Sequence, residues 1–252
     1  MQIVVIHDWP QADPAIVQKV AEIMGILPFE AQQRMGGGGP VVIAQFADPG
    51  AAESLRSELE RAQVPTLLLD PAELRSGPQP VTARKFFLAE TYFRVGMADG
   101  SLLEIPYADM SHLLPATQTL AQAQAGETVT EKKFSLGKTL LAGGVPMRKK
   151  VTSRTEGTAE VRDEVLCLVI AGQRQVLLSR SGLDYAGLGD KMQLSRELNF
   201  NLLKTELRQR APQLVFDSRL LKKAGIVRLL GGAFAPEANL DLAFSILAQT
   251  LS

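Results

Sequence analysis

The residues of this chain that could perform covalent chemistry are few and lie far apart in the sequence. There are two histidines, His7 and His112, and one cysteine, Cys167. A nucleophile needs a base beside it, and a zinc site needs several ligands at close spacing, but neither histidine lies in such a motif. Cys167 lies inside the apolar run VLCLVI, which is typical of a buried strand residue. We therefore predict no catalytic residue, no metal and no cofactor.

Two glycine-containing segments look at first like phosphate-binding sites. The string SLGKTLL ends with Gly137-Lys138-Thr139, as a phosphate-binding loop does. That motif needs a further glycine five residues before Gly137, where this chain has Lys132. The four glycines 36–39 do not form the G-x-G-x-x-G pattern of a dinucleotide site. Both segments are therefore interpreted as loops.

One segment suits non-covalent binding of an anion. Residues 132–154 (KKFSLGKTLLAGGVPMRKKVTSR) contain no acid, and an apolar stretch separates two basic clusters. Such clusters can meet an acidic protein, an anionic membrane (about 1 kcal/mol per base) or nucleic acid. Only Phe134 lies nearby to stack on a nucleic-acid base. The alternative is that the bases only solvate the domain rim. The candidate binding residues are Lys132, Lys133, Lys138, Arg148, Lys149, Lys150 and Arg154.

Composition and charge indicate a globular chain with unlike halves. Hydrophobic residues make up 46% of the 252 residues and charged residues 21%, which is ordinary globular composition. The net charge is zero, but residues 1–80 hold ten acids and five bases, giving −5, so the remainder carries +5. This asymmetry favours two modules with different partners, or two halves that attract each other.

The first 70 residues predict the element order β-α-α-β-α-β. Asp13 and Asp48 are suited to cap helices, and a proline follows each at the first helical position. The expected strands are 2–7, 41–46 and 66–69; the expected helices run from Pro14 to near Gly25, from Pro28 to Met35, and onward from Pro49.

Residues 71–82 hold three prolines and a glycine, which predicts a linker. Residues 83–212 predict a β domain with a hairpin turn at Asp99-Gly100, an insertion at 116–146 and a closing helix at 192–211. That helix is expected to place Leu194, Leu198, Leu202, Leu203 and Leu207 on one side. Further strands are expected at 147–156, 164–171 and 174–179, and a helical tail at 213–252. The predicted fold class is α+β: a small β-α-α-β-α-β domain, then a mostly antiparallel β domain closed by a helix, with a helical tail.

The N-terminal strings VVIHDW, GILPFEAQQRM, VVIAQF and AESLRSELERAQVPTLLL make residues 1–70 resemble the ClpS adaptor family. The C-terminal domain of the ribosomal stalk protein shares this element order. The resemblance rests on the apolar pattern together with Glu30-Ala31, Ala52-Glu53 and Pro65. It implies a fold more than a function.

ClpS proteins grip the α-amino group of a destabilising N-terminal residue. They use an asparagine and acidic residues after the first strand, and a histidine from the following helical region. Here Asp8 corresponds to one acid, while His7 and Trp9 occupy the neighbouring places. Residues 33–36 (QRMG), where the histidine would fall, contain none. We therefore do not expect recognition of N-terminal degrons.

In the second half, the phrase LLEIPYADMSHLL is similar to the strand and turn that bacterial pleckstrin-homology-like domains place before their third strand. This resemblance covers residues 82–212. It implies a curved antiparallel sheet closed by one helix, here 192–211.

Together these patterns predict a non-catalytic interaction or adaptor protein that binds macromolecular partners, a protein in the first place. The alternatives are a peripheral membrane-associating signalling adaptor that uses 132–154, and a small-molecule enzyme with a site between modules. The opening MQIVVIHDWP is too short and too soon interrupted by charge to predict a signal peptide. No window approaches the roughly 20 apolar residues of a membrane span, so a cytoplasmic location is expected.

Overall fold

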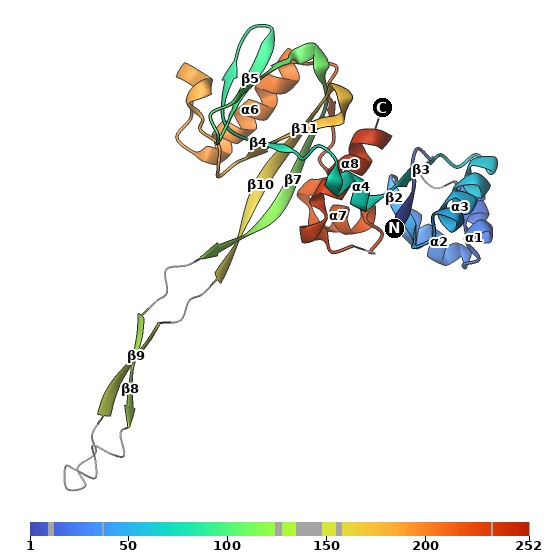
Figure 1. Cartoon of the computed structure of the whole chain (residues 1–252), viewed down its shortest axis with the longest axis horizontal. Coiled ribbons are helices and arrows are strands. Elements are labelled where there is room, and N and C mark those ends of the chain that lie inside the picture. Colours follow the sequence, from blue (N-terminus) through green and yellow to red (C-terminus); the bar gives the residue numbers. More distant parts are fainter. Residues whose placement is uncertain are drawn as a thin grey trace. The chain divides into compact units, whose positions relative to one another are not determined.

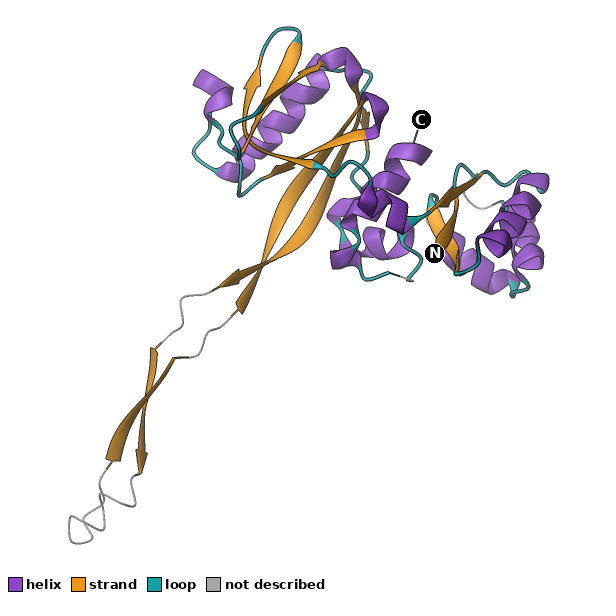
Figure 2. Cartoon of the chain, in the orientation of Figure 1, coloured by secondary structure: helices purple, strands orange, loops and turns teal. Residues whose placement is uncertain are grey.

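The computed structural model describes residues 1–9, 13–36, 38–123, 128–134, 148–154, 158–232 and 234–251. It forms two compact units: one combines Met1–Gln118 with Asp163–Ser252, and the other is Thr119–Arg162. Figure 1 traces the elements along the chain, and Figure 2 separates helices from strands. Within the described ranges, no helix has both the length and the apolar character needed to cross a bilayer.

A three-stranded antiparallel sheet of order β2-β1-β3 begins the first unit. Its central strand alternates between two cores, because successive side chains in a strand point to opposite faces. Ile3 and Val5 join one core, whereas Val4 and Ile6 join the other; all four are fully buried. The strands are β1 (Gln2–Ile6), β2 (Val41–Phe46) and β3 (Thr66–Leu69).

Three helices cover the face of this sheet that carries Val4 and Ile6. The predicted caps are confirmed: Asp13 accepts a hydrogen bond from the Ala15 amide at 2.9 Å, and Asp48 accepts one from the Gly50 amide at 3.0 Å. The expected β-α-α-β-α-β order is also confirmed. The helices are α1 (Pro14–Met24), α2 (Pro28–Met35) and α3 (Pro49–Arg61).

A seven-stranded sheet of order β12-β7-β10-β11-β4-β5-β6 forms the centre of the first unit. The pairings β10–β11, β4–β5 and β5–β6 are antiparallel, whereas β11–β4 and β12–β7 are parallel. The predicted α+β class with a small and a larger, mostly antiparallel sheet is therefore confirmed. The strands are β4 (Val81–Leu88), β5 (Tyr92–Met97), β6 (Leu102–Pro106), β7 (Met110–Ala123), β10 (Thr158–Ile170), β11 (Arg174–Ser179) and β12 (Val215–Phe216).

The apolar run in β10 is buried on both faces of the large sheet. Leu166 and Leu168 pack with helix α6 (Arg196–Arg210), whose Phe200 and Leu203 are fully buried. Cys167 faces the opposite core, as expected for a small buried hydrophobe. An uninterrupted apolar run is the pattern of a strand covered on both sides.

Helices α7 (Lys223–Leu229) and α8 (Leu240–Thr250) fill the core between the two sheets. This core unites Ile3 and Val5 of the small sheet with Val165 and Cys167 of the large one. On the helical side, Phe244 is 2% exposed. The expected helical C-terminal tail is confirmed in its fold class, although Val215–Phe216 within the expected range 213–252 form a short strand, and the helices pack on the face of the N-terminal sheet that carries Ile3 and Val5.

The structure differs from three sequence expectations. Pro71–Ser76 form helix α4 and Val81 begins β4, so part of the expected linker is regular structure. The expected insertion at 116–146 begins inside β7. The expected helix start at 192 is also wrong, because α6 begins at Arg196, where the Ser195 hydroxyl accepts a hydrogen bond from the Leu198 amide at 3.1 Å.

The second unit contains the ends of β7 and β10 that lie beyond Gln118 and before Asp163, together with a two-stranded sheet. That sheet pairs β8 (Thr128–Phe134) with β9 (Arg148–Arg154) in antiparallel register. We call it the β8–β9 hairpin.

Candidate functional site

Six of the seven predicted binding residues lie on the β8–β9 hairpin. The register places Lys132 opposite Lys150, Lys133 opposite Lys149, and Phe134 opposite Arg148. Arg154 pairs with Thr128 at the other end. Lys138, the seventh residue, lies outside the described ranges, as does the rest of the SLGKTLL segment. Two clusters that are about fifteen residues apart in sequence are thus neighbours across one sheet.

This register is electrostatically unfavourable for the hairpin by itself. Two pairs of lysines occupy directly opposite positions, and like charges opposite each other destabilise an antiparallel pair. The fourteen residues of the two strands hold six bases and one acid, Glu131, for a net charge of +5. Bringing these bases together is disfavoured unless anionic groups approach them. The hairpin is therefore strongly basic, and its role in binding an anion stays a prediction.

The charge separates between the two compact units. The unit Thr119–Arg162 holds eight bases and four acids, giving +4, so the other unit carries −4 in this neutral chain. The basic character belongs to the second unit and not to the large sheet as a whole.

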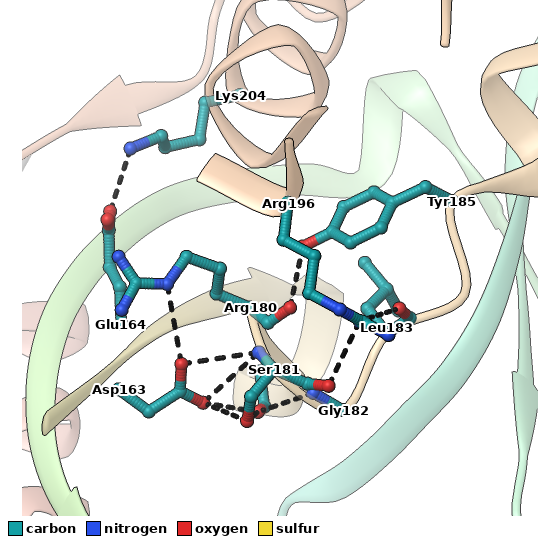
Figure 3. Close-up of polar contacts among 10 residues, drawn as sticks. Asp163, Glu164, Arg180, Ser181, Gly182, Leu183, Tyr185, Arg196 and Lys204 are labelled. Carbon is teal, nitrogen blue, oxygen red and sulfur yellow. Dashed lines mark hydrogen bonds and ion pairs between the residues drawn. The ribbon is translucent and has the colours of Figure 1, made fainter. Parts of the chain in front are cut away.

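A buried polar network lies where β10 re-enters the first unit, and Figure 3 shows it in close-up. Asp163 is 2% exposed and accepts hydrogen bonds from the Ser179 hydroxyl at 2.6 Å and the Ser181 hydroxyl at 2.8 Å. The Ser181 amide donates to the same carboxylate, and the Arg180 Nε lies 3.5 Å from it. A buried carboxylate with this many donors is satisfied. Asp163 thus joins β10 to the turn after β11.

The same turn is tied to helix α6 by two further residues (Figure 3). Arg196 donates to the carbonyl oxygens of Ser181 and Leu183, each at 3.0 Å, and Lys204 pairs with Glu164 at 2.7 Å. Neither histidine is part of this network. The two serine hydroxyls donate to a carboxylate and have no histidine beside them among these contacts, so the network lacks the serine–histidine pair of an activated nucleophile. The network holds β10, the turn after β11 and helix α6 together.

The two histidines and the cysteine occupy structural positions. His112 lies in β7 and is 7% exposed, and its Nε2 lies 2.8 Å from the Leu251 carbonyl oxygen. The Nδ1 of His7 lies 2.7 Å from the Asp8 carboxylate. Burial raises the pKa of the Cys167 thiol far above its usual range, which keeps it protonated. Among the residues described, no three or more His, Cys, Asp or Glu gather as a metal site would require.

A hollow of about 610 Å³ lies beside the residues on which the ClpS resemblance depends. Trp9, Val17, Phe29 and Met35 are its apolar lining, and Phe29 is 66% exposed. Asp8, which corresponds to one acid of that family, has a positive φ of 52°. No histidine is among the described residues that line the hollow. Failure to bind N-terminal degrons remains a prediction.

One exposed apolar segment was misplaced by sequence reasoning. Leu194 and Leu198 were expected on the buried side of a helix, yet their exposed fractions are 107% and 54%. Leu194 precedes α6, and Leu198 lies on its first turn. Ser195 carries the signal that was overlooked, because serine is a preferred N-cap and marks a helix start after Leu194.

No protein-family model, no curated protein and no solved structure matches the chain.

Proposed function

We propose that this chain is a non-catalytic adaptor that binds an acidic protein surface through the β8–β9 hairpin. The observation that carries the proposal is the register, which sets Lys132 against Lys150 and Lys133 against Lys149. Lysines in opposite positions repel each other and destabilise the free hairpin. Carboxylates placed beside them would be attracted to both lysines and would offset that repulsion. The partner accordingly carries a cluster of Asp or Glu side chains.

The polar groups of the first unit support a non-catalytic role. His112 bonds the Leu251 carbonyl oxygen, and Ser179 and Ser181 donate to Asp163. The Cys167 thiol is fully buried. Each of these groups already has a structural partner or is enclosed in a core, so none supports a nucleophile–base pair.

A protein partner fits the hairpin better than a membrane or a single-stranded nucleic acid. Val129, Phe134 and Val151 are the only apolar residues on its two strands, which offers little surface for insertion into lipid. Phe134 is also its only aromatic residue, whereas single-stranded nucleic acid is held by several stacking rings. Hydroxyl residues and bases dominate the rest, and they suit carboxylates.

The test replaces Arg148, Lys149 and Lys150 with glutamine in the full chain. A matched control replaces three other exposed bases with glutamine: Lys85, Lys222 and Arg228, for which no carboxylate partner is found among the described residues. Binding to a fluorescent polyglutamate peptide is measured by anisotropy at low and at physiological salt. We expect the hairpin variant to lose most binding and most salt dependence, since exposed charges are screened over about 8 Å at physiological ionic strength.

Equal losses in the hairpin variant and the control would overturn the proposal, because binding would then follow net charge. Parallel measurements use duplex DNA and vesicles that contain phosphatidylserine. If the hairpin variant loses binding to one of those probes while polyglutamate does not bind, the partner class is wrong. If the variant unfolds, the bases serve internal pairing and the hairpin is not a binding surface.

A further inference from the structure

Three large apolar side chains are exposed within one short segment of the first unit. The exposed fractions are 55% for Met192, 107% for Leu194 and 54% for Leu198. Single exposed apolar residues are common on protein surfaces and need no explanation, but a group of them marks an interaction site. We call residues 192–198 the presenting segment.

The presenting segment is held in place by side chains beneath it. Asn199 is 5% exposed; its Oδ1 accepts from the Gln193 amide at 2.6 Å, and its Nδ2 donates to the Gln193 carbonyl at 3.0 Å. The Met192 amide donates to the Gly189 carbonyl at 3.1 Å. Both backbone polar groups of Gln193 are thus bonded to one buried side chain. Apolar groups on a fixed backbone lose little further freedom when a partner binds.

A hollow of about 450 Å³ adjoins the presenting segment, and two arginines line it. Arg84 lies at a bulge of β4, between the pairs Ala83–Met97 and Lys85–Gly96, and a bulge redirects the side chain of its extra residue. Arg196 reaches the hollow from the first turn of α6.

Neither guanidinium is neutralised within the described chain. Arg196 bonds only neutral carbonyls and lies 5.9 Å from the centre of the Tyr185 ring (Figure 3). Arg84 makes no ion pair with a described residue. Asp184 is the only acid among the lining residues, and its carboxylate already accepts a hydrogen bond from the Ala186 amide. The hollow therefore attracts a carboxylate from outside.

We propose that the presenting segment and this hollow form a second docking surface, which binds a partner peptide carrying apolar side chains beside an Asp or Glu. Leu194 and Leu198 contact the apolar side chains, and Arg84 and Arg196 pair with the carboxylate. The surface is separate from the β8–β9 hairpin and does not depend on it. A second copy of this chain is a different occupant, and the experiment below distinguishes it from a peptide.

The experiment selects a random peptide library against the full chain, with counter-selection against the double variant Leu194→Ser/Leu198→Ser. Both leucines are exposed, so their replacement leaves the cores intact. Enriched peptides are labelled and titrated by fluorescence anisotropy. We expect them to combine apolar residues with Asp or Glu, and to bind the double variant and Arg84→Gln at least about tenfold more weakly, a factor that corresponds to about 1.4 kcal/mol.

Two controls keep this result distinct from the proposed function. Leu102→Ser removes an apolar side chain of similar exposure (58%) on β6, and should leave peptide binding unchanged. The glutamine variant of Arg148, Lys149 and Lys150 should also leave it unchanged. Absence of enrichment over the double variant, or enriched peptides that lack carboxylates, would overturn the proposal. So would sedimentation showing a dimer that the double variant abolishes, since the occupant would then be a second copy.

Discussion

The β8–β9 hairpin and the presenting segment are proposed as two different kinds of binding surface. The hairpin brings together bases with one acid among them, and its two lysine pairs oppose each other across the strands. The presenting segment shows three apolar side chains beside two arginines and is fixed from below by Asn199. The first acts at a distance and is screened by salt, whereas the second acts by contact and depends on a fixed backbone.

The two surfaces should therefore respond differently to changes in the surrounding structure. Charge on a two-stranded hairpin survives local rearrangement, because long-range attraction needs no particular side-chain geometry. A contact surface fails when its support moves by about 1 Å, because its fit depends on residues underneath. Changes below the presenting segment should therefore affect it and spare the hairpin.

The largest effect is expected from Phe200→Ala. Phe200 is fully buried and anchors α6, the helix whose first residues end the presenting segment, in the core beside the large sheet. Loss of a buried phenylalanine ring costs about 3–5 kcal/mol. Urea unfolding should show a corresponding decrease in the free energy of unfolding. A decrease close to zero would mean that α6 does not depend on this contact.

A smaller effect, confined to one surface, is expected from Asn199→Ala. The change removes both hydrogen bonds to Gln193 and should lower the free energy of unfolding by about 1–3 kcal/mol. Peptides selected on the presenting segment should bind more weakly, while polyglutamate binding to the hairpin should not change. Anisotropy with both probes measures this contrast, and equal losses at both surfaces would contradict it.

Acid should loosen the start of the presenting segment. A hydrogen bond from Lys191, the neighbour of Met192, lowers the pKa of Glu206, and Arg210 lowers it further. A carboxylate whose pKa is lower in the folded state contributes stability above its unfolded value of about 4.3, and loses it as the pH falls through the folded value. The free energy of unfolding should therefore decline below about pH 4.3. In Glu206→Gln this part of the decline should be absent, as urea titrations at several pH values can determine.

The smallest effect is expected from Lys150→Glu. Lys150 lies opposite Lys132, so the change turns a like-charge pair into an opposite-charge pair worth about 0.2–1 kcal/mol. Amide hydrogen exchange in the hairpin should slow, while binding of polyglutamate should weaken. Stability and binding thus change in opposite directions. A variant that both stabilises the hairpin and binds more tightly would contradict the proposed role of these bases.

Local sequence determined most elements of this protein. Asp13-Pro14 and Asp48-Pro49 fix helix starts through caps that involve neighbouring residues only. The apolar runs in β1 and in β10 (VLCLVI) indicate which residues are buried. The basic content of 132–154 was visible in the same way. Each of these signals lies within a few residues, so no knowledge of the remaining chain was needed.

Tertiary structure alone decided how those residues combine. The pairing of Lys132 with Lys150 depends on the register of two separate strands. Arg84 and Arg196 line one hollow because the bulge of β4 lies close to the start of α6. Leu194 and Leu203 are both leucines of one apolar pattern, yet Leu194 is exposed and Leu203 is fully buried. Whether a residue is buried depends on which other parts of the chain pack against it. The side-chain type alone does not determine those contacts.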